Sequence, residues 1–155
     1  MSLENEPARP IDILLVEDNE ADIKITRRAF EKGHLQNFLH VVRDGEEALD
    51  FIYGFNTYWD HQQYPRPDLI LLDINLPKLD GFNVLKKIKE DTDYKDIPVI
   101  MLTSSRSEGD MVNSFKSGAC SYIPKPVSFQ QFAEMASGLK VYWQTINRFP
   151  AKQRT

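Results

Sequence analysis

Cysteine is almost absent from this chain of 155 residues, in which Cys120 stands alone. An intramolecular disulfide and a cysteine-based zinc site are therefore excluded, and a reducing compartment, the cytoplasm, is expected. Long apolar runs are missing as well, and the first ten residues carry acids and prolines where a signal peptide needs a basic start and an apolar centre. The sequence therefore predicts no membrane segment.

An excess of positive charge is also lacking, because 19 Lys and Arg residues face 23 Asp and Glu residues and the formal net charge is -4. Surfaces that bind nucleic acid usually show clustered Lys and Arg, so no nucleic-acid partner is expected. Repeats and low-complexity tracts are missing too, and the length suits one domain. We expect a flexible arm over residues 1–10, one domain over 11–149 and a tail over 150–155.

What the sequence does contain is an alternation of short β-type runs and helix-like stretches. This alternation is typical of βαβ units, in which helices connect parallel strands. Right-handed crossovers then place helices on both faces of the sheet, so we expect an α/β fold with a doubly wound, five-stranded parallel sheet. The predicted strands are 11–16, 38–42, 69–72, 99–102 and 120–123, and the predicted helices are 20–32, 46–53, 81–90, 107–116 and one that begins at Ser128.

Local signals support several of these boundaries. Gly33 is expected to end the first helix in a left-handed cap, and Ser128 with Gln131 forms a predicted capping box. Pro77 and Gly81 bracket a turn, where we expect glycine to supply backbone angles denied to other residues.

Polar residues follow four of the predicted strands: Glu17 and Asp18, then Asp73, then Thr103, and then, after one proline, Lys125. The carboxyl ends of parallel strands meet at one edge of the sheet, where ligands bind. Each residue alone has a simpler explanation, such as a helix-capping acid, a turn residue or a solvated surface charge. Their joint placement instead predicts one pocket holding three carboxylates, a hydroxyl and an ammonium group.

The segments that carry these residues resemble the receiver domain of two-component response regulators over residues 11–147. The resemblance implies a flavodoxin-like (βα)5 fold. The block RPDLILLDINLPKLDG, with the extended segment before it, is most similar to single-domain regulators that partner bacteriophytochrome-type sensor kinases. The matching segments are LLVEDN (14–19), LLDINLPKLDG (71–81), MLTSS (101–105) and SYIPKP (121–126).

The resemblance implies that Asp73 is the phosphoacceptor, which takes a phosphoryl group from a phosphohistidine on a sensor histidine kinase or a phosphotransfer protein. Mg²⁺ is the implied cofactor, with Asp18 and Asp73 as ligands, Glu17 binding through water and the backbone carbonyl of Asn75 as a further ligand. Many relatives have Asp at the position of Glu17. The chain is thus expected to be a signalling phosphoacceptor that catalyses only its own phosphorylation and slow autodephosphorylation.

The resemblance also assigns the response to phosphorylation. Lys125 and Thr103 are expected to bind phosphoryl oxygens. Inward movement of Thr103 would then let Tyr122 rotate from an exposed to a buried position, as a two-state switch. The implied output surface covers 107–116 and 121–148.

Two further positions are expected to tune the lifetime of the phosphoryl group. Asn75 and Ser105 stand where family members control the access of hydrolytic water. The resemblance also implies a cis peptide bond between Lys125 and Pro126, the family's usual site for one; proline is the residue for which the cis form costs little.

Association with other proteins is expected, since no DNA-binding or enzymatic output segment is visible and the effect must pass through a downstream protein. Met135, Tyr142 and Phe149 recur every seven residues beside the apolar stripe of the last helix and predict a homodimer or kinase-docking surface. Packing of this helix on its own domain is the open alternative. The aromatic-rich segment 54–68 either contacts a partner or folds over its own domain.

Other functional classes fit less well. A haloacid-dehalogenase-like phosphatase typically needs a second Asp two residues after its nucleophile, where this chain has Asn75. A nucleotide-binding domain would need a glycine-rich or hydroxyl-rich loop after the first strand, where residues 17–20 are mostly acidic. The alternative that stays open is a receiver-like binding module that works without phosphorylation.

Overall fold

The structure is a computed structural model and describes residues 10–33, 37–114 and 121–137. Most of the predicted N-terminal arm and the whole predicted tail lie outside these residues, so the limits of the domain stay predictions. Strands and helices alternate along the described chain. They are β1 (Ile11–Val16), α1 (Glu20–Lys32), β2 (Asn37–Val42), α2 (Gly45–Tyr53), a short 3-10 helix η2 (Asn56–Tyr58), β3 (Leu69–Asp73), α3 (Gly81–Glu90), β4 (Val99–Thr103), α4 (Arg106–Ser114), β5 (Ser121–Pro124) and α5 (Phe129–Ser137).

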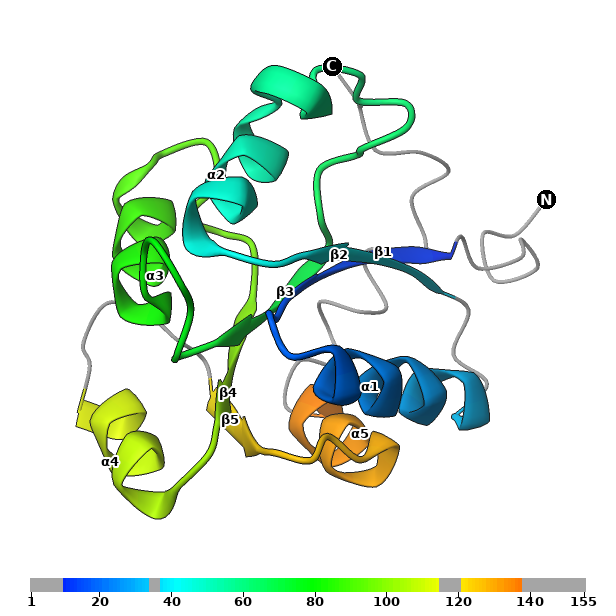
Figure 1. The fold of residues 1–155 in the computed structure, drawn as a ribbon, viewed down its shortest axis with the longest axis vertical. Coiled ribbons are helices and arrows are strands. Elements are labelled where there is room, and N and C mark those ends of the chain that lie inside the picture. The colour runs from blue at the N-terminus through cyan, green and yellow to red at the C-terminus, as the bar shows by residue number, and fades with distance from the viewer. Residues whose placement is uncertain (1–9, 34–36, 115–120, 138–155) are drawn as a thin grey trace, which may run out of the picture.

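The five strands form one parallel sheet in the order β2-β1-β3-β4-β5. Figure 1 shows α1 and α5 against one face of this sheet and α2, α3 and α4 against the other. The predicted doubly wound, flavodoxin-like fold is therefore confirmed.

The central strands are buried on both faces, which explains why they are apolar throughout. Every residue of β1, β3 and β4 is buried. Successive side chains point to opposite faces, so Leu14 and Leu72 join the core under α2 to α4, whereas Leu15 and Leu71 join the core under α1 and α5. The sheet is therefore packed on both faces beneath its loops.

Side-chain caps mark the beginning of four helices, α1, α2, α3 and α5, and Ser105 caps α4 in the same way. Asn19, Asp44, Asp80 and Ser128 each accept a hydrogen bond from the backbone N–H three residues later. For α1 this role belongs to Asn19, which leaves the two preceding acids, Glu17 and Asp18, outside the cap.

The predicted reasons for two glycines are wrong. Gly33 has φ -77° and is not left-handed; a Cβ there would lie 2.3 Å from the ring of Phe129, so glycine is needed for close packing of α5 on α1. Gly81 likewise has no positive φ, and a Cβ there would lie 2.3 Å from the backbone oxygen of Asp73. The left-handed residue of this turn is Lys78, with φ 68°.

The helices near the carboxyl end differ in part from expectation. Helix α4 begins at Arg106 and its described part ends at Ser114, and β5 ends one residue later than predicted. In α5, Ala133 is exposed, while Met135 is half-buried and packs on its own domain. Tyr142 and Phe149 lie outside the described residues. Among the described helices, none has the length and apolar character required to cross a membrane.

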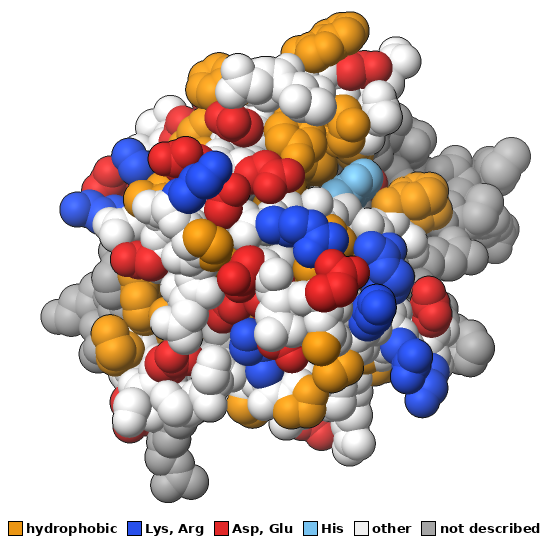
Figure 2. Space-filling model, viewed as in Figure 1, with side chains coloured by type: hydrophobic (Ala, Val, Ile, Leu, Met, Phe, Trp, Pro, Cys, Tyr) orange, Lys and Arg blue, Asp and Glu red, His pale blue; other side chains and the backbone are white. Residues whose placement is uncertain are grey.

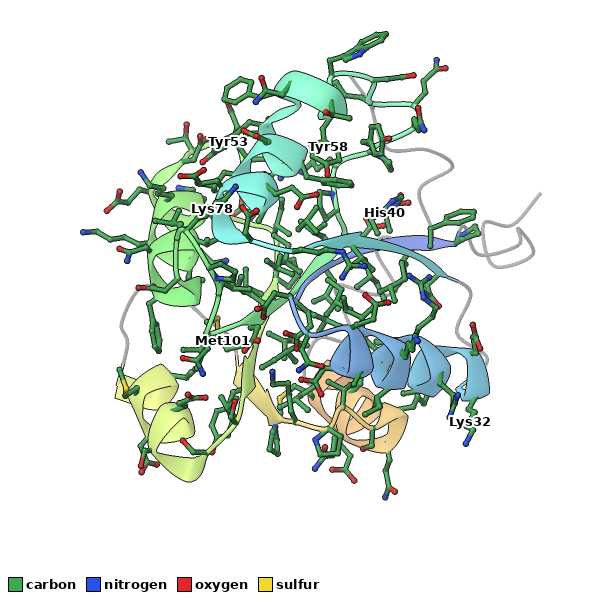
Figure 3. The ribbon with its side chains drawn as sticks, in the orientation of Figure 1. Lys32, His40, Tyr53, Tyr58, Lys78 and Met101 are labelled. Atoms are coloured by element: carbon green, nitrogen blue, oxygen red, sulfur yellow. The ribbon has the colours of Figure 1, made fainter. Side chains whose placement is uncertain are left out.

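The aromatic segment between α2 and β3 folds partly over its own domain. Tyr58 and Tyr64 contact the ring of Phe51, at centroid distances of 5.1 and 5.8 Å. Figure 3 shows Tyr58 beside α2, where its hydroxyl donates a hydrogen bond to Glu47. Trp59 is 72% exposed. The segment is thus packed on one side and offers an exposed aromatic ring on the other.

Candidate functional site

The predicted polar residues meet at the carboxyl edge of the sheet. Glu17, Asp18, Asp73 and Lys125 line one open pocket, and Thr103 ends the strand next to that of Asp73. Figure 2 shows acidic side chains across the middle of this face, with basic side chains over α1. The structure therefore brings together residues that lie up to 108 positions apart in the chain.

Lys125 is the centre of the site. Its Nζ donates hydrogen bonds to Glu17 Oε1 at 3.0 Å, to Asp73 Oδ2 at 3.0 Å and to Asp22 Oδ2 at 3.2 Å. The side chains of Glu17 and Asp73 are only 1% and 2% exposed, respectively. One ammonium group thus compensates two buried carboxylates and a third at the pocket's rim.

Burial and charge act against each other on these groups. Burial, followed by hydrogen bonding and repulsion from Asp73, raises the pKa of Glu17 to about 7, although Lys125 acts to lower it. Burial alone would lower the pKa of Lys125, but its interactions with Glu17 and Asp73 outweigh burial and raise that pKa. The lysine therefore stays charged, while burial and the neighbouring Asp73 make Glu17 a weaker acid in spite of Lys125.

The acidic side chains also fit a metal ion. One carboxylate oxygen from each of Glu17, Asp18 and Asp73 lies within 4.8 Å of the others. Oxygen donors of this kind are the ligands of hard divalent cations, and Asp18 is exposed, so an ion can reach it. Asn75 lies beside the cluster, where its N–H donates to Asp73 Oδ1 at 3.3 Å.

Thr103 presents an unusual hydroxyl group. The residue is 1% exposed, and among the described residues its Oγ1 is the buried side-chain polar atom for which no hydrogen-bond partner is found. Its carbonyl oxygen accepts from the backbone N–H of Lys125 at 2.8 Å, which joins the ends of β4 and β5. The peptide bond between Lys125 and Pro126 is cis, as expected.

The other two predicted residues lie around α4. Tyr122 is half-buried, and a Cβ on Gly109 of α4 would come within 2.6 Å of its ring, so the ring rests against that helix. The Ser105 hydroxyl accepts from the backbone N–H of Glu108 at 3.2 Å. Both residues thus connect β4 and β5 with the start of α4.

Two residues of the site were not predicted from the sequence. Asp22 contacts Lys125 from the first turn of α1, and Glu108 accepts hydrogen bonds from Asn75 and from the backbone of Ser104. The signal for Glu108 was present, since Ser105 and Glu108 have the spacing of a capping box. For Asp22, the only signal in the sequence was its position close to the loop after β1.

A parallel sheet in this order, with acids and a lysine converging at its carboxyl edge, defines a receiver-type α/β module. A family model described as the response regulator receiver domain matches residues 13–137. The chain belongs to this family, which acts in two-component signal transduction and whose members partner with histidine kinases.

Relatives in the same family are similar along almost the whole chain. Response regulator Rcp1 from Synechocystis sp. is 37% identical over 151 residues, covering 97% of this chain and 99% of its own length. A solved structure of its Mn²⁺-bound form has a TM-score of 0.69 and covers 92% of this chain and all of that one.

Two further solved structures extend the likeness to phytochrome-linked regulators. The bacteriophytochrome response regulator AtBRR is 40% identical, with a TM-score of 0.76 and coverage of 95% of this chain and 99% of that one. The phosphorylated cyanobacterial phytochrome response regulator RcpA is 36% identical, with a TM-score of 0.71 and coverage of 92% and 100%. The predicted resemblance to regulators of the bacteriophytochrome type is confirmed.

Proposed function

We propose that Asp73 accepts a phosphoryl group from a phosphohistidine of a sensor kinase or a phosphotransfer protein. A carboxylate oxygen of Asp73 forms a bond to phosphorus while the phosphorus–nitrogen bond breaks, and the electron pair leaves on the imidazole nitrogen. The product is an acyl phosphate on the regulator and a free histidine on the donor. Membership of the receiver family supports this reaction, and a related regulator has been solved in phosphorylated form.

The observation that carries the proposal is the unpartnered hydroxyl of Thr103 at the strand end beside Asp73. A buried hydroxyl without a partner costs free energy, and a phosphoryl oxygen would satisfy it. Lys125, already within 3.0 Å of Asp73, would bind a second phosphoryl oxygen. Donors aimed at the transferred group lower the barrier as its charge moves.

Mg²⁺ is the proposed cofactor, held by Asp18 and Asp73, by Glu17 directly or through water, and by the carbonyl of Asn75. When bound, it supplies positive charge that offsets repulsion between the Asp73 carboxylate and phosphoryl oxygens. The mutual proximity of three carboxylate oxygens supports this ligand set, and related Rcp1 has been solved with Mn²⁺.

The proposed output is a conformational switch of Thr103 and Tyr122 that changes contacts with a downstream protein. Two observations support this switch: the Thr103 hydroxyl has no hydrogen-bond partner among the described residues, and the Tyr122 ring rests against Gly109 of α4. A Tyr122→Ala variant is expected to accept phosphate but to lose phosphorylation-dependent partner binding. Retention of both properties would remove the switch from the proposal.

The proposed setting is the cytoplasm, with a sensor histidine kinase upstream. Homodimerisation through the last helix also stays a proposal, although Met135 packs on its own domain. Sedimentation that gives a monomer with and without a phosphoryl analogue would count against the dimer.

The test is intact-mass measurement after incubation with acetyl phosphate and Mg²⁺. A gain of one phosphoryl group is expected in the native chain and lost in Asp73→Asn and in EDTA. Glu20→Gln serves as the matched control, because Glu20 also lines the pocket but pairs with Arg43 and does not contact Lys125. No gain under any condition would favour the alternative, a receiver-like module that works without phosphorylation.

The lifetime of the phosphoryl group is proposed to depend on Asn75 and Ser105. Replacing either with Ala should change the dephosphorylation rate without preventing phosphorylation. Rates equal to the native rate for both variants would refute this role.

A further inference from the structure

Glu108, in the first turn of α4, binds two groups at the rim of the phosphorylation pocket. Its Oε1 accepts from the backbone N–H of Ser104 at 2.7 Å, and its Oε2 accepts from Asn75 Nδ2 at 2.7 Å. Ser104 and Asn75 both line the pocket that holds Asp73. A carboxylate from α4 therefore occupies two hydrogen-bond donors beside the group that is to receive phosphate.

Helix capping explains only part of this arrangement. In a capping box, the glutamate three residues after the N-cap accepts from the backbone N–H of the N-cap itself. The N-cap of α4 is Ser105, whose hydroxyl accepts from the Glu108 N–H. The Glu108 carboxylate instead binds the preceding residue, Ser104, which directly follows Thr103, and also reaches the loop after β3.

We propose that Glu108 is an internal anion that competes with the phosphoryl group on Asp73 for the donors of Ser104 and Asn75. The inference rests on the proposed phosphorylation of Asp73. A phosphoryl group adds a charge of about -2 and three strong acceptor oxygens to the pocket. It would repel the carboxylate and offer better acceptors to the same donors, so Glu108 leaves them and releases the first turn of α4.

This competition would link the site to α4 through charge, in addition to the proposed movement of Tyr122. A ligand shifts an equilibrium only by its differential affinity for the two states. If the phosphoryl group must displace the Glu108 carboxylate, part of its binding free energy is spent on that displacement. Removing the charge of Glu108 should therefore make the binding of a phosphoryl group tighter. The expected gain is about three- to tenfold, which corresponds to one competing charge-assisted hydrogen bond near the surface.

The experiment uses the full chain with Glu108→Gln, Glu108→Ala and Asp110→Asn. Asp110 is exposed on the same helix, so its variant controls for loss of one negative charge from α4. Two quantities are measured in Mg²⁺: the dissociation constant for beryllofluoride, as a phosphoryl analogue, and the phosphorylation rate with acetyl phosphate. Both Glu108 variants should bind beryllofluoride about three- to tenfold more tightly than the native chain and react faster, whereas Asp110→Asn should stay close to native.

The outcomes separate competition from capping. Beryllofluoride affinity equal to or weaker than native in both Glu108 variants, with a lower melting temperature for Glu108→Ala, would reduce Glu108 to a cap and overturn the inference. A native chain that takes up neither probe would instead defeat the proposed function.

A second measurement needs no phosphoryl group. In native protein without beryllofluoride, the Ser104 amide proton should resonate downfield and move upfield in Glu108→Ala. An unchanged Ser104 resonance would show that this amide is not bound by the carboxylate and would also overturn the inference.

Discussion

The central strands β1 and β3 have buried acids at both ends, and the two ends behave differently. Asp12 and Asp68 lie at the amino end, and Glu17 and Asp73 lie five positions later at the carboxyl end. All four are 1% or 2% exposed. At the amino end, Asp68 Oδ2 accepts from the backbone N–H of Asp12 at 2.8 Å, and Asp12 Oδ1 lies 3.2 Å from a ring nitrogen of His40. Figure 3 shows His40 on β2.

At the carboxyl end, the close partner of both acids is a side chain that can move. Lys125 contacts Glu17 and Asp73 at 3.0 Å, whereas the backbone N–H groups that face these acids are at 3.3 and 3.4 Å. Asp68, whose carboxylate accepts from the backbone of β1, acts as part of the fold. In the proposed function, a carboxylate balanced by a lysine in an open pocket can release that lysine when Mg²⁺ binds and Asp73 is phosphorylated.

Loss of the cation should give the largest effect. Lys125→Met leaves two buried carboxylates without their ammonium partner, so the free energy of unfolding should fall by about 3 kcal/mol. Mg²⁺ should restore more stability to this variant than to the native chain. Lys78→Met is the control, because Lys78 is exposed and lies 3.6 Å from Asp44, and urea unfolding should show almost no change. Equal losses in both variants would contradict the compensating role of Lys125.

The two ends can be compared directly through Asp68→Ala and Asp73→Ala. The first leaves the buried Asp12 N–H without this acceptor and should cost about 2 kcal/mol. The second removes a charge that repels Glu17, and Lys125 keeps Glu17 and Asp22, so the change should stay below about 1 kcal/mol. Urea unfolding without Mg²⁺ measures both values. A larger loss for Asp73→Ala would reverse the assignment of structural and functional acids.

Thr103→Val should increase the stability of the protein and weaken its binding of a phosphoryl analogue. Valine keeps the shape of threonine and removes the unpartnered hydroxyl, so the free energy of unfolding should rise by about 1 kcal/mol. Beryllofluoride should bind more weakly, because one donor is lost. Destabilisation of the variant by urea would indicate that Oγ1 has a partner in the unphosphorylated protein.

The smallest effect is expected for Asp22→Asn. Asp22 is 27% exposed and is the third carboxylate on Lys125, so its contribution to stability should be below about 0.5 kcal/mol. A loss comparable with that of Lys125→Met would place Asp22 with the buried acids.

The fold could be predicted from sequence because its signals are local and repeated. The buried runs of β1, β3 and β4 and the polar residues after them fixed the order of elements and the edge that carries the site. The roles of Gly33 and Gly81 could not be predicted, because they depend on the Phe129 ring and the Asp73 carbonyl, which approach from other elements.

The composition of the pocket was predictable, but its internal contacts were not. In the sequence, Asp22 is an ordinary acidic residue in the first turn of α1. It belongs to the site only because the Lys125 side chain, which follows β5, contacts it. Glu108 reads as a capping residue, and its contact with Asn75 depends on how the loop after β3 folds towards α4. Asp12 and Asp68 gave no signal, because the contact between them depends on how β1 lies beside β3, and the contact of Asp12 with His40 depends on how β1 pairs with β2.

The distance along the chain between Glu17 and Lys125 has a consequence for biosynthesis. The acids of β1 and β3 leave the ribosome long before the lysine that compensates them, and β5 must add to the sheet's edge before Lys125 can reach them. A nascent chain that ends before residue 125 thus lacks the ammonium group that compensates these acids. The pocket is therefore complete only after residue 125 has left the ribosome and β5 has joined the sheet.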